Sequence, residues 1–174
     1  SSAPVLVDGN LDPVDWGGLA GVEIMVLEAT VGNAMATPPA KAWLIHDGTA
    51  LLVGFTTPLT QVRDLGTTWG QSDATELAFQ EEGNFRAELL VLRGYTNGSW
   101  EVTDETGTSD ETRARVRQGV EYAAVQRDDH WSAGWKIPLR NLDIEPGERI
   151  RFNLTVRRID GAQWIMWRPT LGHS

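Results

Sequence analysis

A chain of 174 residues suits one folded domain, residues 1–174, and is short for two ordinary ones. Its 24 acidic and 15 basic residues give a net charge of −9. This charge disfavours a nucleic-acid groove or docking on anionic lipid, because both need a basic face. No run approaches the ~20 apolar residues that span a bilayer. The lack of cysteine excludes disulfides, thiolate metal sites and thiol nucleophiles.

The first part of the chain alternates between apolar runs and turn residues. Residues 22–27 predict a strand. A loop is predicted at 31–40, because this range contains Gly32, Asn33 and two prolines. The apolar runs 41–45 and 50–56 flank Asp47-Gly48, which is a strong hairpin signal. We therefore expect an antiparallel pair of strands that turns at Asp47-Gly48.

The middle of the chain predicts a second hairpin and then a polar segment. Residues 75–80 and 86–92 are separated by Glu81-Glu82-Gly83-Asn84, and a further short strand is predicted at 100–103. Residues 104–118 are acidic first and then basic, which favours a mobile loop, with a short helix as the alternative.

The last part of the chain carries the clearest strand pattern. Residues 120–126, 131–137 and 163–167 predict strands, and residues 150–156 alternate with apolar side chains at even numbers. We expect the even-numbered side chains of 150–156 to face the core. About nine or ten short strands at regular spacing predict an all-β, antiparallel, two-sheet β-sandwich of the jelly-roll or immunoglobulin-like type.

Catalytic motifs are not evident in the sequence. The three histidines, His46, His130 and His173, have no metal-ligand spacing, and the G-x-S-x-G, H-E-x-x-H and P-loop patterns do not occur. A Ser/His/Asp triad stays open in principle, but nothing points to one. We therefore expect a domain that is not an enzyme.

One acidic turn has the oxygen density of a calcium loop. Asp8-Gly9-Asn10-Leu11-Asp12 offers several oxygen ligands, which Ca²⁺ prefers, although it lacks the full EF-hand spacing. We predict a structural Ca²⁺ held by Asp8 or Asp12. The alternative is an acidic turn that binds no metal.

Tryptophan dominates the aromatic residues, with eight Trp against two Tyr and four Phe. Most of these tryptophans fall within predicted strands and are expected in the core. Trp69 differs because it lies between Gly66-Thr67-Thr68 and Gly70-Gln71-Ser72-Asp73, a loop-like setting. An indole on a loop is a natural platform for the apolar face of a sugar ring.

Several motifs together resemble carbohydrate-binding module family 9 and its relatives in the DOMON-like superfamily. The opening Val7-Asp8-Gly9-Asn10-Leu11-Asp12, followed by Trp16, is similar to the first motif of that family. The other matching segments are Ala42 to Gly48, Trp69 to Leu77, Trp135 to Leu139, Pro146 to Glu148, Phe152 to Val156 and Trp167 to Thr170.

This resemblance implies a β-sandwich that binds a polysaccharide or oligosaccharide without catalysis. It implies a secreted protein in which the module accompanies other domains of a polysaccharide-degrading enzyme, and it implies structural Ca²⁺. Trp69 matches a clamp tryptophan, and Glu76 and Arg86 match acidic and basic hydroxyl partners. Glu88 stands where the family has Asn, and Trp167 is a candidate for the second clamp residue.

The hairpin centred between residues 81 and 82 places Glu76 near the register of residue 87, and hence diagonal to Arg86. Two alternatives to sugar binding remain open. One is a spacer sandwich that has lost sugar binding. The other is a haem-binding relative, which needs a Met/His pair drawn from residues such as Met166 and His130.

Overall fold

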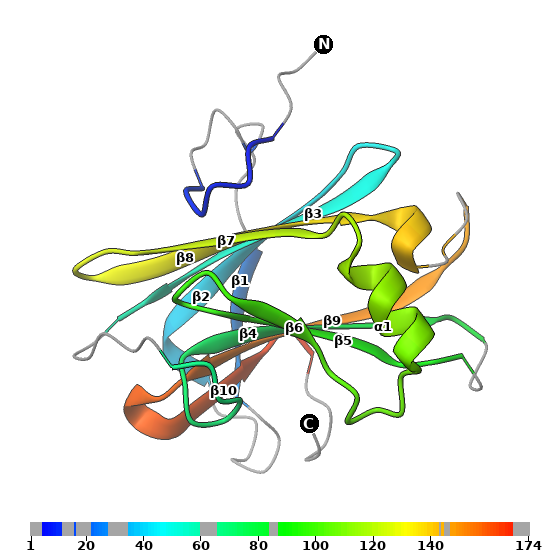
Figure 1. Ribbon diagram of the computed structural model, residues 1–174. Coiled ribbons are helices and arrows are strands. Elements are labelled where there is room, and N and C mark those ends of the chain that lie inside the picture. The colour runs from blue at the N-terminus through cyan, green and yellow to red at the C-terminus, as the bar shows by residue number, and fades with distance from the viewer. Residues whose placement is uncertain are drawn as a thin grey trace.

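The computed structural model describes residues 5–11, 16, 35–59, 66–83, 87–142, 144 and 147–168, and the backbone of 22–27. In these residues, ten strands and one short α-helix make up most of the regular structure (Figure 1). The strands are β1 (Val22–Leu27), β2 (Met35–His46), β3 (Ala50–Pro58), β4 (Ala74–Glu81), β5 (Leu90–Tyr95), β6 (Trp100–Val102), β7 (Glu121–Gln126), β8 (His130–Pro138), β9 (Ile150–Arg158) and β10 (Gln163–Met166). The helices are α1 (Asp110–Arg117) and the 3₁₀ turns η2 (Leu139–Leu142) and η3 (Asp160–Ala162).

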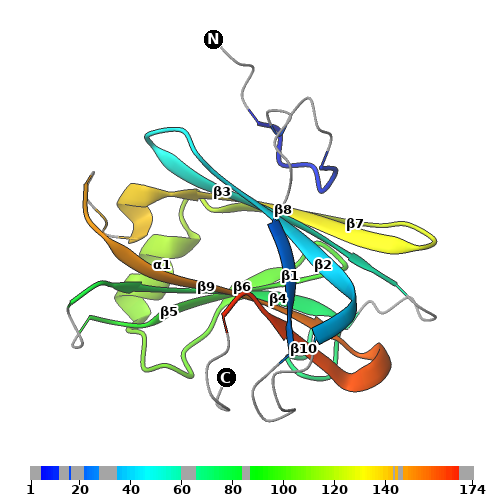
Figure 2. The ribbon, with the colours of Figure 1, turned by 180° about the vertical axis from the view of Figure 1, so that it is seen from behind.

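The strands form one antiparallel ladder that folds over into two layers. Its order is β6-β5-β4-β9-β10-β1-β2-β3-β8-β7. Figures 1 and 2 show β6, β5, β4, β9 and β10 in one layer, here called the first sheet. The strands β2, β3, β8 and β7 form the second sheet, and β1 pairs with both β10 and β2 and so links the two. The predicted antiparallel sandwich is confirmed.

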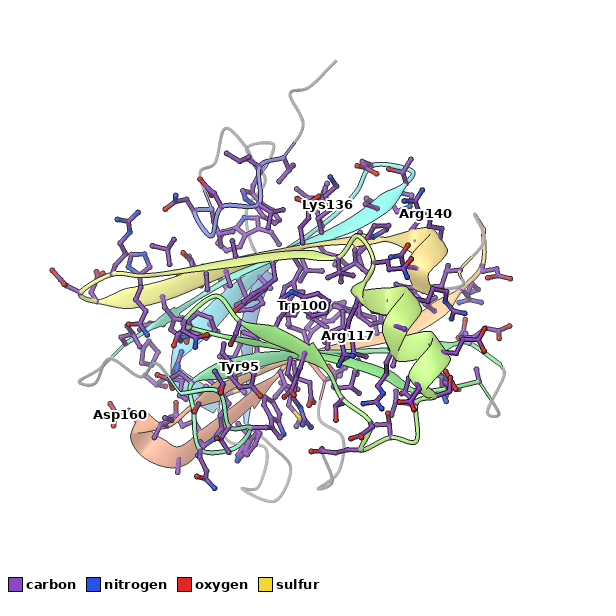
Figure 3. All side chains as sticks on the ribbon, viewed as in Figure 1. Tyr95, Trp100, Arg117, Lys136, Arg140 and Asp160 are labelled. Carbon is purple, nitrogen blue, oxygen red and sulfur yellow. The ribbon has the colours of Figure 1, made fainter. Side chains whose placement is uncertain are left out.

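The core lies between the two sheets. Trp131 and Trp135 of β8 are fully buried there, as expected for tryptophans in strands. Trp100 of the first sheet reaches between the layers (Figure 3), where its ring centroid lies 5.8 Å from that of Trp135. The alternation in β9 is also confirmed. Leu154 and Val156 are buried, and Ile150 and Phe152 pack against the same core cluster.

The loop predicted at 31–40 is wrong from residue 35 onward, where β2 already begins. The register of β2 against β1 shifts between Ile24 and Val26, so residues 36–39 form an irregular bulge. The two prolines, Pro38 and Pro39, lie in this bulge. A proline lacks the N–H that a regular ladder needs, but a bulge tolerates it.

The mobile loop predicted at 104–118 is wrong for residues 110–117, which form α1. Ser109 caps the helix, because its Oγ accepts a hydrogen bond from Thr112 N at 3.2 Å. Acidic residues occupy the first turn and basic residues the last, which suits the helix dipole. Val116 is fully buried and attaches the helix to the core.

The second predicted hairpin has a different register from the one expected. Glu76 pairs with Arg93, six positions beyond the expected residue 87. The reason is a longer connection, since β4 ends at Glu81 and β5 begins only at Leu90. The last residues of β4 pair with β9 alone, with Glu81 opposite Ile150, and β5 has already separated from them.

The N-terminal segment packs on the outer face of the second sheet. Trp16 is 1% exposed and lies over Gly54 of β3 and Gly134 of β8, which are register partners. A Cβ atom on Gly54 would lie only 2.9 Å from the Trp16 ring, so the indole needs glycine beneath it. The described residues of this motif, 7–11 and Trp16, therefore cover this sheet.

Candidate functional site

The outer face of the first sheet carries charged side chains that are almost buried. Glu76 of β4 is 9% exposed and Arg93 of β5 is 5% exposed. They are register partners, and both point away from the core because their chain neighbours Leu77 and Leu92 fill it. Strand pairing thus places a glutamate and an arginine side by side on the outer face of the sheet, where neither side chain contributes to the core.

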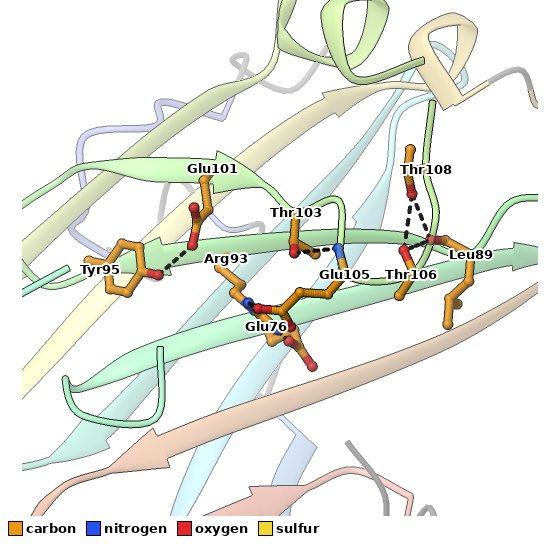
Figure 4. Close-up of polar contacts among 9 residues, drawn as sticks. All are labelled: Glu76, Leu89, Arg93, Tyr95, Glu101, Thr103, Glu105, Thr106 and Thr108. Atoms are coloured by element: carbon orange, nitrogen blue, oxygen red, sulfur yellow. Dashed lines mark hydrogen bonds and ion pairs between the residues drawn. The ribbon is translucent and has the colours of Figure 1, made fainter. Parts of the chain in front are cut away.

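Arg93 joins two carboxylates in one network (Figure 4). Its Nε donates to Glu76 Oε2 at 2.8 Å, and Nη1 and Nη2 donate to the Glu105 carboxylate at 3.0 and 2.7 Å. A guanidinium has five N–H bonds, so two remain without a partner among the described residues, as does Glu76 Oε1. These free groups are a hydrogen-bond donor and acceptor set.

The environment shifts the ionisation of both carboxylates. Burial raises the pKa of Glu76 above its ordinary value, although the hydrogen bond and charge of Arg93 oppose the rise. The hydrogen bonds from Arg93 lower the pKa of Glu105, which is largely exposed. Nearly buried ionisable groups with shifted pKa values are concentrated at functional sites more often than elsewhere on a protein.

A tyrosine and a further glutamate form a separate hydrogen bond beside this network. The Tyr95 hydroxyl donates to Glu101 Oε1 at 2.6 Å, and Glu101 is the register partner of Arg93 on β6 (Figure 4). Burial raises the pKa of Tyr95. Tyr95 therefore stays a neutral hydrogen-bond donor to Glu101.

Trp69 lies beside the network on the loop that precedes β4. It is half-buried, and the Cζ of Arg93 is 4.4 Å from the centroid of its ring. The ring of Trp164 from β10 meets it at 5.1 Å and an angle of 69°. Arg157 contacts both sides of this ring pair. Its Cζ lies 4.8 Å from the ring centroid of Trp164, and its Nε donates to the backbone oxygen of Gly70, the residue after Trp69, at 3.1 Å. Trp69 is thus a positioned aromatic group whose remaining surface is open to solvent.

A cleft begins at this charged pair and follows the outer face of the sheet. Glu76, Arg93 and Glu105 line its charged end, together with Thr155 of β9. The carboxylate, guanidinium and adjacent indole can bind a ligand that carries both hydroxyl groups and apolar C–H faces.

Two other residues expected to bind sugar, Glu88 and Trp167, lie elsewhere. Glu88 is exposed, and its Oε1 accepts from Ser109 N at 3.1 Å at the start of α1. Trp167 packs against Phe152 at 5.9 Å and lines a small apolar pocket with Trp43 and Leu44. Arg86 lies outside the described residues.

The amino-terminal acidic turn is confirmed as a turn, with Asn10 N donating to Asp8 Oδ1 at 2.8 Å. Three more oxygens of this turn also accept hydrogen bonds from protein groups. Asn10 Nδ2 donates to Asp8 Oδ2, Arg127 to Asn10 Oδ1 and Ser132 to Gly9 O. These oxygens do not fit a calcium site by themselves, and Asp12 lies outside the described residues. No group of three metal-ligating side chains occurs in the described part of the chain.

Sequence reasoning missed three residues of the site: Arg93, Glu105 and Trp164. Arg93 is the register partner of Glu76, but only the true length of the connection between β4 and β5 places it there. Glu105 lies in a segment without periodicity, and Trp164 reaches Trp69 through the β9–β10 pairing. No local sequence pattern reports either contact.

Two comparisons with known proteins found nothing. No protein family model matches the chain. No curated protein matches it either.

Solved structures do resemble it. A carbohydrate-binding module family 9 domain from Caldicellulosiruptor kristjanssonii in complex with glucose aligns with a TM-score of 0.65 and 17% identity, over 96% of this chain and 83% of that chain. This chain has the fold of those modules. A family 9 module from the same organism in complex with cellotriose gives a TM-score of 0.64 at 17% identity, over 93% and 78% of the two chains.

A third solved structure has the same fold. A putative carbohydrate-binding protein from Bacteroides uniformis aligns with a TM-score of 0.59 and 15% identity, over 96% of this chain and 86% of that chain. These three structures confirm the family 9 fold that the sequence motifs imply.

In the described part of this chain, no helix is long and apolar enough to cross a membrane.

Proposed function

We propose that this domain is a non-catalytic carbohydrate-binding module that holds a saccharide at the charged end of the cleft. One observation carries the proposal: a nearly buried Glu76–Arg93 pair with free hydrogen-bonding groups lies beside a half-buried tryptophan. Desolvating two charges is costly, and such a pair stabilises a fold little compared with apolar residues of the same size. Its presence on an outer sheet face favours a binding role.

The chemistry of the site suits a sugar. The free Oε1 of Glu76 accepts from one hydroxyl group, and the free N–H bonds of Arg93 donate to another. The open part of the Trp69 ring packs on the apolar C–H face of the pyranose. The fold shared with modules in complex with glucose and cellotriose supports the same assignment.

We also propose a setting for the domain. A binding module without a catalytic centre serves to hold an enzyme at its polysaccharide, so this domain accompanies the catalytic domain of a secreted polysaccharide-active enzyme. The fold likeness supports this setting, and the net charge of −9 agrees with a partner that is not a polyanion.

The proposal is tested by titrating the protein with glucose and with cellotriose and following the NMR signals of the indole groups. Trp69→Ala removes the stacking surface, and we expect the dissociation constant to rise about tenfold or more, which corresponds to about 1.4 kcal/mol. The melting temperature changes little, because the half-buried ring mainly loses a cation–π contact worth about 1 kcal/mol.

Trp43→Ala is the matched control, since Trp43 is another half-buried tryptophan and belongs to the second sheet. It leaves the dissociation constant unchanged. Trp167→Ala tests the remaining sequence-based expectation in the same assay. If the wild-type protein binds neither sugar, the proposal fails and the sandwich is a spacer. If Trp69→Ala binds as tightly as the wild type, Trp69 is not the platform.

A further inference from the structure

The hydrogen bonds of Arg93 determine which groups it can still bind. A guanidinium holds a carboxylate through two parallel N–H bonds, at its Nη1–Nη2 edge or at its Nε–Nη2 edge. Glu105 takes the first edge with both of its oxygens, at 3.0 and 2.7 Å. Glu76 takes the Nε bond of the second edge at 2.8 Å. The two N–H bonds that remain belong to different nitrogens, so each can donate to a hydroxyl group, but together they cannot hold a carboxylate.

The loop between β6 and α1 carries Glu105 and is held in place by hydrogen bonds. The hydroxyls of Thr106 and Thr108 both donate to Leu89 O, just before β5, at 2.6 and 3.1 Å (Figure 4). The Glu105 backbone N–H donates to Thr103 Oγ1 at 3.1 Å. The Glu105 side chain is 61% exposed, and an ion pair at such a position adds little to stability. Its two-oxygen contact with the guanidinium therefore favours a role in binding.

The charged end of the cleft carries an excess of negative charge, because two carboxylates there surround the one guanidinium of Arg93. Arg151 is the other cationic residue among the described residues that line the cleft. It is the register partner of Gln80, four residues along β4 from Glu76, which is about 13 Å at 3.2–3.4 Å per residue. Salt at 0.1 M screens exposed charges beyond about 10 Å. A ligand carboxylate at the charged end therefore meets two like charges and a cation that is already paired.

We infer that Glu105 restricts this site to uncharged saccharides, because it occupies the edge of Arg93 that would bind the carboxylate of a sugar acid. Glu105 is thus a specificity-determining residue. Hydroxyl groups of a neutral sugar use the remaining N–H bonds of Arg93 and the free oxygen of Glu76. The Cζ of Arg93 lies 4.4 Å from the Trp69 ring centroid, so a sugar acid stacked on Trp69 would reach the edge if Glu105 were absent. This inference rests on the proposed function.

The test titrates the protein with glucose, glucuronamide and glucuronate by calorimetry. The last two sugars differ only in an amide or a carboxylate, so the ratio of their dissociation constants, glucuronate over glucuronamide, measures the exclusion of charge. We expect a ratio of about ten or more for the wild type, which corresponds to about 1.4 kcal/mol. Glu105→Ala frees the edge, and the ratio falls about tenfold or more. Glu105→Gln keeps one acceptor oxygen at the edge, and the ratio falls less.

Glu101→Gln is the matched control. Glu101 is the register partner of Arg93 on β6, and its carboxylate bonds to Tyr95. The variant removes the same charge from the same sheet but frees no edge of Arg93, so the ratio keeps its wild-type value.

A variant that merely loosens Arg93 weakens the binding of both sugars alike and leaves the ratio unchanged. The inference is overturned if the ratio in Glu105→Ala equals that of the wild type, if Glu101→Gln lowers it as much, or if Glu105→Ala binds neither glucuronamide nor glucuronate. A wild-type protein that binds glucuronate as tightly as glucuronamide also overturns it. If the wild type binds none of the three sugars, the proposed function itself fails.

Discussion

Glu76 is the residue whose state most depends on its surroundings. In water a glutamate is ionised at neutral pH, but here burial raises its pKa and Arg93 limits the rise. The ionised form is the one that accepts hydroxyl hydrogen bonds at both oxygens. Sugar binding through Glu76 is therefore expected to weaken as the pH falls through its raised pKa.

The raised pKa also predicts a pH dependence of stability. Between the ordinary pKa of a glutamate and the raised value, the native state binds more protons than the unfolded state. The free energy of unfolding then falls as the pH rises through this range. We expect Glu76→Gln, which cannot ionise, to lack this fall.

The measurement is the melting temperature from pH 4 to pH 8 for the wild type and Glu76→Gln. The difference, variant minus wild type, should become more positive as the pH rises. A Glu105→Gln variant is the control, because the pKa of Glu105 is lowered, and the stability it contributes is lost as the pH falls. A constant difference for Glu76→Gln contradicts the prediction.

At the scale of elements, the N-terminal segment acts as a cover for the second sheet. Gly9 O accepts from Ser132 Oγ at 2.6 Å, and Arg127 Nη2 donates to Asn10 Oδ1 at 2.7 Å. These bonds hold the turn beside β8, and Trp16 then packs over the paired glycines. Glycine at 54 and 134 has a packing reason, the close approach of an indole to the backbone.

We expect Trp16→Ala to lower the free energy of unfolding by about 3–5 kcal/mol, because it leaves a large cavity on the sheet. Urea unfolding followed by circular dichroism measures the change. Trp43→Ala, at a half-buried position in the same sheet, serves as the comparison and costs less. An equal, small effect of both variants would mean that the segment is not part of the cooperative unit.

Calcium binding at the amino-terminal turn stays a prediction. An ion at 100 times its dissociation constant adds ~2.7 kcal/mol to stability. The melting temperature in millimolar Ca²⁺ should therefore exceed that in excess EDTA, and Asp8→Asn should reduce the difference. Equal melting temperatures contradict the prediction and agree with the observed pairing of the Asp8 oxygens with Asn10.

At the scale of the whole molecule, hydrogen bonds join the first sheet, which carries Glu76 and Arg93, to the second sheet. Tyr122 of β7 donates from its hydroxyl to Tyr95 O at 2.9 Å, two residues along β5 from Arg93. At the other end, Arg158 of β9 donates to Thr57 Oγ1 of β3 and to Pro38 O of β2, both at 2.7 Å. Two of the strands that line the cleft, β5 and β9, are thus hydrogen-bonded to the second sheet.

The sequence by itself determined features that depend on near neighbours in the chain. Alternating side chains in β9 identify its core face, because successive residues of a strand point to opposite sides. The Asp47-Gly48 turn is equally local, since Asp47 Oδ1 accepts from the N–H groups of Thr49 and Ala50. Trp69 and Glu76 were predicted as site residues from local features, a loop setting and a family motif.

Only the tertiary structure decided which groups meet Trp69 and Glu76. Arg93 reaches Glu76 because the connection from β4 to β5 is longer than a tight hairpin, and a change in loop length alters every cross-strand pair. Glu105 and Trp164 come from segments 29 and 88 residues beyond Glu76, and no local pattern records such distant contacts. Register and strand order, which follow from the packing of the whole sandwich, therefore determine the site.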